Sequence, residues 1–244
     1  HVQLAHHFRY GSGVKPSTKR ALYHYEKAAI AGYPTSTIQY AQWLLRGGNG
    51  VLVDDEKAQY WGRQAAIGLT KKANGGSSSA AKTLGRLYRD GVFVRRDFAE
   101  AERWFRRSSR LGDSGGMHEL AVLMLRERDE NAGADEALGW LRMAAELGHG
   151  GAVTGLGRLH LKRAHGLSDV EAVGLFEKGV ALRHPGSMEE LARLLAEGRL
   201  VTKDPTRAYE LAQEGAKLGH KGAKALLSEL ETKIQSSSAQ FSKS

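Results

Sequence analysis

The chain repeats a two-part residue pattern about every 36 positions. One part reads alanine, two residues, a large and often aromatic side chain, then a pair of small residues three or four positions further on. It occurs six times, with the first alanine at Ala21, Ala58, Ala101, Ala137, Ala172 and Ala208. A period of this length is typical of solenoids, in which each unit buries its apolar face against its neighbours.

The other part of the pattern lies upstream and places a large apolar residue before a small one. It starts at Leu4, Tyr40, Leu84, Leu120, Leu156 and Leu191. In the downstream part, Ala101, Trp104 and Ser108 fall on a single helical stripe, where small residues allow close helix approach and aromatics fill the space between units. Two columns per unit predict two helices per unit. We therefore expect an all-α, right-handed α-α superhelical solenoid of about six two-helix repeats plus a C-terminal capping helix.

Glycines mark the predicted ends of the second helices, at the position where a helix commonly turns left-handed. They are Gly32, Gly68, Gly112, Gly148 and Gly219, and His184 interrupts this column. The expected domain is a single solenoid over residues 1–234. Its predicted parts are units 1–32, 33–68, 77–112, 113–148, 149–184 and 185–219, an inserted loop 69–76, a cap 220–234 and a polar tail 235–244.

The unit resembles the Sel-1-like repeat family, which is related to tetratricopeptide repeats. The residues that carry the resemblance are Leu84-Gly85-Arg86-Leu87-Tyr88, the turn Gly11-Ser12-Gly13-Val14 and the helix start Lys57-Ala58. The turn is shortened at Gly91-Val92, and repeats four to six have other residues there. The resemblance implies a helical solenoid that binds partners in the concavity of its superhelix. The residues expected to face that concavity are Gln42, Arg86, Arg89, Arg158 and Arg193.

Charge is distributed unevenly over a chain whose formal net charge is +9 and whose sequence pI is about 9.7. Residues 69–112 contain 11 Lys and Arg against 4 Asp and Glu, whereas residues 113–148 contain 3 against 8. This charge run is either a solvated helix face partly paired with the acidic fourth unit or a docking surface for RNA or an acidic protein. The basic stripe consists of Arg95, Arg96, Arg103, Arg106, Arg107 and Arg110.

Motifs for catalysis or metal binding do not emerge from the sequence. There is no cysteine, which excludes disulfides and thiolate sites. The Sel-1-like repeat family that the chain resembles has a cysteine-rich branch to which β-lactam binding has been attributed, and the lack of cysteine argues against membership of that branch. His149, His184 and His220 recur at the same place in successive repeats, which separates them by about 8 to 10 Å, too far to share a zinc ion. The glycine-rich segment 74–79 lacks the Gly-Lys-Ser/Thr of a phosphate loop. We predict no enzyme activity, no metal and no cofactor.

Two functions remain. The first is a non-catalytic protein-binding scaffold or adaptor, as a subunit or assembly factor of a larger complex. The second is a basic-surface component of a ribonucleoprotein or ribosome-associated assembly that contacts RNA, for which a mitochondrial setting is compatible with the basic, cysteine-free composition. The longest apolar runs are far below the roughly 18 residues that span a bilayer, so no membrane span is expected. We expect an intracellular location, with any targeting segment upstream of His1.

Overall fold

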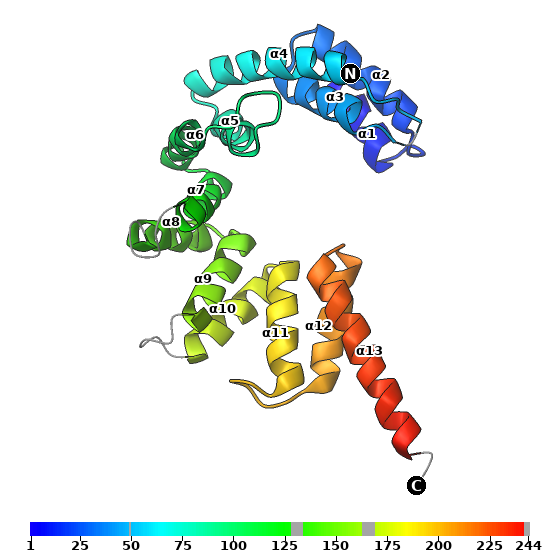
Figure 1. Ribbon diagram of the computed structural model, residues 1–244, viewed down its shortest axis with the longest axis vertical. Coiled ribbons are helices and arrows are strands. Elements are labelled where there is room, and N and C mark those ends of the chain that lie inside the picture. The colour runs from blue at the N-terminus through cyan, green and yellow to red at the C-terminus, as the bar shows by residue number, and fades with distance from the viewer. Residues whose placement is uncertain (49, 128–133, 163–168, 242–244) are drawn as a thin grey trace. The chain divides into compact units, whose positions relative to one another are not determined.

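The computed structural model describes residues 1–48, 50–127, 134–162 and 169–241, which form thirteen helices and no strand (Figure 1). The first six are α1 (Val2–Tyr10), α2 (Thr18–Ile30), α3 (Pro34–Arg46), α4 (Asp55–Asn74), α5 (Ser78–Asp90) and α6 (Phe98–Arg110). The others are α7 (Ser114–Glu127), α8 (Ala134–Glu146), α9 (Gly150–Lys162), α10 (Asp169–Ala181), α11 (Pro185–Glu197), α12 (Pro205–Lys217) and α13 (Lys221–Phe241).

The helices follow the predicted pairs, α1 with α2 through α11 with α12, before α13 closes the series. The all-α prediction with two helices per repeat is therefore confirmed. Contacts group the chain into two compact units, His1–Leu123 and Met124–Ser244, called here the N-terminal and C-terminal units. The boundary falls inside α7. The prediction of one continuous domain over residues 1–234 stays a prediction.

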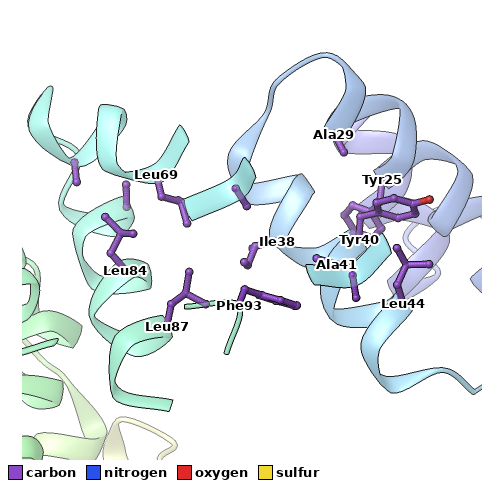
Figure 2. Close-up of a cluster of buried hydrophobic side chains, with 14 of the residues drawn as sticks. Tyr25, Ala29, Ile38, Tyr40, Ala41, Leu44, Leu69, Leu84, Leu87 and Phe93 are labelled. Atoms are coloured by element: carbon purple, nitrogen blue, oxygen red, sulfur yellow. The ribbon is translucent and has the colours of Figure 1, made fainter. Parts of the chain in front are cut away.

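Each unit has its own hydrophobic core, made by the large residues of the first helices and the aromatics of the second. In the N-terminal unit, Figure 2 shows Ile38, Leu69, Leu87 and Phe93 converging between α3, α4 and α5. In the C-terminal unit, Phe176 is fully buried together with residues of α11. Burying each large side chain of this kind contributes about 1.5 to 3 kcal/mol. The alanines that start the second-helix pattern are also buried, as expected for small residues that allow the helices to approach closely.

The predicted loop over residues 69–76 is wrong, because α4 continues through Asn74. Leu69 and Ala73 extend the buried stripe of α4 by two further turns and are 1% and 0% exposed. Gly68, taken as the end of the helix, lies inside it, where an added Cβ would come within 3.0 Å of the Pro34 side chain. The residue that turns left-handed after α4 is Gly76, with φ +93°.

The other predicted helix-ending glycines adopt the left-handed conformation, with φ between +77° and +81° at Gly32, Gly112 and Gly148 and +84° at Gly219. The interruption of this column was assigned to the wrong residue. Arg183, not His184, occupies the left-handed position of the fifth repeat, with φ +54°. A residue with a Cβ is strained there by about 1 to 2 kcal/mol.

The turn between the two helices of a repeat persists where its sequence departs from Gly-x-Gly-Val. In the first repeat Gly13 has φ +74°, and Phe93 and Leu200 take the same place in the third and sixth repeats at +65° and +67°. The turn at Gly91 is therefore of full length and not shortened as predicted. Phe93 fits because Gly62 on α4 leaves room for its ring, where an added Cβ would lie 2.1 Å from Phe93 Cγ. Of the departures predicted at Arg126 to Gly133 and at Arg163 to Leu167, the first from residue 128 onward and the whole of the second lie outside the described residues.

The capping helix α13 is longer than predicted. Its buried residues Ala223, Leu226 and Leu230 cover the end of the C-terminal unit. The helix then continues to Phe241 through residues predicted as a polar tail, because this stretch has no proline or glycine to stop it. Residues 242–244 of that tail lie outside the described ranges. None of the described helices combines the length and the apolar character needed to cross a membrane.

Candidate functional site

The arginines expected to face a partner make ion pairs that link one repeat to the next. Arg86 Nη2 lies 2.6 Å from Glu119 Oε1, and Arg89 pairs with the other oxygen of that carboxylate. In the C-terminal unit Arg158 Nε lies 2.6 Å from Glu190 Oε1. We call these three arginines and their two glutamates the inter-repeat ladder. Exposed ion pairs of this kind each contribute about 0 to 1 kcal/mol, so the ladder fixes neighbouring first helices only weakly.

The ladder could have been read from the repeat alignment. Glu119 and Glu190 each directly precede the leucine that starts the first-helix column. The remaining expected residues behave differently: Arg193 pairs with Glu189 of its own helix at 3.0 Å, and Gln42 is half-buried on α3. A role of these side chains in binding a partner stays a prediction.

The six arginines of the basic stripe separate into different environments. Arg106 pairs with Glu102 at 2.9 Å, and the Arg96 guanidinium lies 5.3 Å from the centre of the Phe98 ring. Arg95 borders a depression on the other side of the repeat, lined also by Arg63 and Phe93. The remaining three line one pocket of about 540 Å³, called here the arginine pocket. Its lining residues are Asn74, Arg103, Trp104, Arg107, Arg110 and Leu111.

The arginine pocket lies where α6 meets the end of α4. Arg107 holds the two helices together, because its Nε donates to the Ala73 carbonyl at 2.9 Å and its Nη2 to the Asn74 carbonyl at 3.0 Å. These carbonyls are among those that a helix end leaves without an intrahelical donor. This helix end exists only because α4 extends past Gly68, so the pocket cannot be predicted from a helix that ends at Gly68.

The other two arginines of the pocket are exposed, as Arg107 is. Arg103 pairs with Glu100 at 3.2 Å, and its guanidinium lies 5.3 Å from the centre of the Trp104 ring. Arg110 makes no hydrogen bond or ion pair within the ranges that the structure describes. The pocket therefore offers guanidinium groups that the protein itself does not fully use.

Large apolar side chains are exposed on the second helices of the first two repeats. Tyr23 and Ile30 on α2 are 53% and 63% exposed, and Tyr60 and Ile67 on α4 are 53% and 64% exposed. We call these four residues the apolar ridge. They occupy equivalent positions, two and nine residues after Ala21 and Ala58, and this second recurrence of the repeat is the signal in the sequence that could have identified them. At the same two positions the third repeat has Arg103 and Arg110.

The three recurring histidines lie immediately before first helices. His149 Nδ1 accepts from the Ala152 amide at 3.1 Å and His220 Nδ1 from the Ala223 amide at 3.3 Å, so both cap helices. His184 contacts Thr154 Oγ1 at 2.8 Å instead. Burial, followed by the nearby charges of the other two histidines and Arg158, lowers the pKa of His184. In the described part of the chain, His, Asp and Glu side chains nowhere gather in threes as metal ligands do.

Comparison with known proteins gives consistent results for the family and the fold. The family model described as Sel1 repeat matches residues 1–33, 34–67, 78–113, 115–149 and 185–220, which is more than half of the chain. The fifth repeat is unmatched, although α9 and α10 form its two helices. No curated protein matches the chain.

Three solved structures with a similar fold come from bacteria. The protective antigen c5321 of uropathogenic Escherichia coli, which displays an SLR fold, has a TM-score of 0.64 at 25% identity over 94% of this chain and 48% of its own. This chain thus spans about half of that protein. A Sel1 repeat protein of Oxalobacter formigenes has a TM-score of 0.66 at 24% identity, over 88% of this chain and 86% of its own.

A third similar structure is the immunity protein Pa5087 of Pseudomonas aeruginosa, with a TM-score of 0.61 at 16% identity over 91% of this chain and 84% of that protein. These likenesses confirm the predicted helical solenoid fold. The family match, the two-helix repeats and the left-handed glycine column agree, and the chain belongs to the Sel1 repeat family.

Proposed function

We propose that this protein is a non-catalytic scaffold that binds a protein partner, as a subunit or assembly factor of a larger complex. Proteins built from Sel1 repeats generally mediate protein–protein interaction as scaffolds. Stacked repeats suit this role, because they present an extended surface whose exposed positions vary while the core columns stay fixed.

The apolar ridge is the observation that carries the proposal. Its two tyrosines and two isoleucines stand on neighbouring second helices, which the pair between Lys57 Nζ and Glu26 Oε1 joins at 3.1 Å. Four large apolar side chains, each more than half exposed, are unfavourable in water, and burying them on association is favourable. Tyrosine is also among the residues enriched in protein interfaces.

The first-helix column forms a second contact surface in this proposal. Arg86 and Arg158 keep 49% of their side chains exposed while paired, so each can still donate hydrogen bonds to a partner. Gln42, Arg89 and Arg193 lie in the same column or close to it. Ion pairs with the protein's own glutamates reduce the positive charge of this surface, which favours a polar protein segment over a polyanion.

Affinity capture with a matched pair of variants tests the scaffold function. The change Tyr60→Ser with Ile67→Ser removes half of the apolar ridge and should abolish capture of the partner that the unaltered chain retains. The control, Leu147→Ser with Leu218→Ser, removes two side chains of similar exposure, 59% and 47%, from the C-terminal unit and should leave capture unchanged. Equal capture by both double variants would contradict the proposal.

The ribonucleoprotein alternative, with its mitochondrial setting, depends on the basic third repeat. It predicts that the captured proteins are released when the sample is treated with ribonuclease. The scaffold proposal predicts that they stay bound, because contacts between protein surfaces do not require RNA.

A further inference from the structure

We propose that the arginine pocket binds a carboxylate group of an acidic segment in the protein partner. This inference rests on the proposed scaffold function and adds the chemistry of the partner. The lining residues supply three guanidinium groups, the amide side chain of Asn74 and no carboxylate. Arginine suits such a ligand, because its planar fork can donate two parallel hydrogen bonds to one carboxylate.

The three guanidinium groups are held in position to different degrees before a ligand binds. Arg107 is held in place by the carbonyls of Ala73 and Asn74, which occupy Nε and Nη2 and leave Nη1 for a ligand. Arg103 is oriented by its contact with the Trp104 ring. Arg110, which also lines the pocket, has no hydrogen bond or ion pair among the described residues and can turn towards a ligand. A fixed donor reduces the entropy lost on binding, and a mobile one lets the pocket adjust.

Trp104 provides a second, independent indication of a ligand. Its side chain is 5% exposed and forms part of the pocket wall, yet the Nε1–H group has no acceptor in the part of the chain described. A buried donor without an acceptor is uncommon in native proteins. Because the Nε1 atom has less than 1 Å² of accessible surface, a ligand oxygen would form this hydrogen bond only with a small movement of the pocket wall.

The surroundings favour an acidic protein segment over RNA. An RNA strand binds through several phosphates along an extended cationic track. Around the pocket, however, Lys82, Arg86 and Arg106 are each paired with a carboxylate of the protein itself, so they add less charge to such a track. Leu111, 45% exposed at the pocket edge, adds an apolar contact.

The position of the pocket in the repeats suggests the order of residues in the partner. Arg103 and Arg110 occupy the positions that Tyr60 and Ile67 occupy in the preceding repeat. A segment that crosses the second helices in sequence would therefore meet the apolar ridge first and the arginine pocket next. We expect a partner segment with apolar residues on one side of an Asp or Glu.

Fluorescence anisotropy with a labelled hexaglutamate peptide tests the pocket directly. The variant Arg110→Ala, which removes no hydrogen bond or ion pair among the described residues, should weaken binding of the peptide by about tenfold or more, as expected for the loss of a charge-assisted hydrogen bond. Arg103→Ala should act in the same direction. Arg95→Ala is the matched control, because it removes the same charge from the same repeat outside the pocket, and it should change the affinity by less than about twofold.

Several results would overturn the inference. They are the absence of saturable hexaglutamate binding, equal affinity of Arg110→Ala and the unaltered chain, or an equal loss with Arg95→Ala. Tighter binding of labelled hexauridylate, lost in Arg110→Ala, would assign the pocket to nucleic acid. The Tyr60→Ser, Ile67→Ser variant separates this inference from the scaffold function: it should lose the natural partner and keep hexaglutamate binding.

Discussion

Two junctions between repeats, one in each unit, solve the same packing problem with different chemistry. Before α7, Asp113 caps the helix by accepting from the Gly116 amide at 2.8 Å and pairs with Lys82 Nζ at 2.9 Å. Before α11, the equivalent residue is His184, which contacts Thr154 Oγ1 at 2.8 Å. Lys82 and Thr154 occupy equivalent positions on α5 and α9. One junction thus uses an ion pair and the other a neutral hydrogen bond.

The two junctions also differ in which helix carries the serine and which carries the glycine. In the N-terminal unit Ser108 on the second helix faces Gly116 on the next first helix, where an added Cβ would lie 2.4 Å from Ser108 Oγ. In the C-terminal unit glycine is on the second helix and serine on the first: a Cβ at Gly179 would lie 1.9 Å from Ser187 Oγ. Each junction has room for one hydroxymethyl group, whichever helix provides it. Packing volume is therefore the shared constraint, and polarity is free to vary.

The largest expected loss of stability comes from placing two serine side chains in the space that holds one. Gly179→Ser should reduce the free energy of unfolding by about 3 kcal/mol, because two side chains would compete for one site. Adding Ser187→Gly removes this competition and copies the small residues of the other junction, although it also removes the hydrogen bond between Ser187 Oγ and Thr154 Oγ1, which lie 2.6 Å apart. The double variant should recover most of the loss.

Urea unfolding, monitored by circular dichroism, measures the free energy of unfolding of the single and the double variant. A double variant no more stable than Gly179→Ser alone would contradict the idea that the junctions are interchangeable. The expected coupling between the two positions is about 2 kcal/mol, within the range found for side chains in contact.

A second effect should be confined to the ion-paired junction. Asp113→Ala removes the helix cap and leaves Lys82, 23% exposed, without its partner, so the free energy of unfolding should fall by about 2 kcal/mol. Asp113→Asn keeps a capping oxygen and should cost about half as much. Equal losses for the two variants in urea unfolding would assign the whole effect to the ion pair.

A third effect concerns the residue that precedes each junction. Gly112 before Asp113 has φ +81°, whereas Arg183 before His184 is forced to φ +54°. Arg183→Gly should stabilise the protein by about 1 kcal/mol, since the relief of left-handed strain exceeds the loss of the exposed pair with Glu214. Gly112→Arg should destabilise by a similar amount. Thermal unfolding of both variants measures these opposite changes in stability. A change of the same sign in both variants would disprove the prediction.

The sequence predicts the features that repeat and misses those that depend on a single departure. The core columns and four of the helix-ending glycines were found because their period is regular. Gly68 has the right spacing to end a helix, but Leu69 and Ala73 continue the buried stripe past it, and burial outweighs the low helix propensity of glycine. The arginine pocket depends on that extension. The left-handed Arg183 could have been found from the repeat spacing, because it follows Ala172 at the same distance at which Gly112 follows Ala101, although residue preference alone argues against it.

The smallest expected effect is a difference between the two junctions in how their contribution to stability depends on pH. Burial and the nearby positive groups of His149, His220 and Arg158 lower the pKa of His184 below the 6.5 of an ordinary histidine. Its contribution to stability is therefore complete above pH 6.5 and is lost as the pH falls from there through the lowered pKa. Burial would raise the pKa of Asp113, but its hydrogen bonds with Lys82 and Gly116 outweigh this and lower it below 3.8.

Between pH 6.5 and 5 only the histidine junction should weaken, because the contribution of Asp113 is lost only below 3.8, as the pH falls through its lowered pKa. His184→Asn removes the titrating ring, so the loss of unfolding free energy between pH 7.5 and 5.5 should be smaller than in the unaltered chain. Asp113→Asn is the control and should keep the full loss over this interval. If His184→Asn keeps it too, other histidines cause the pH dependence, and the two junctions differ in geometry but not in their response to acid.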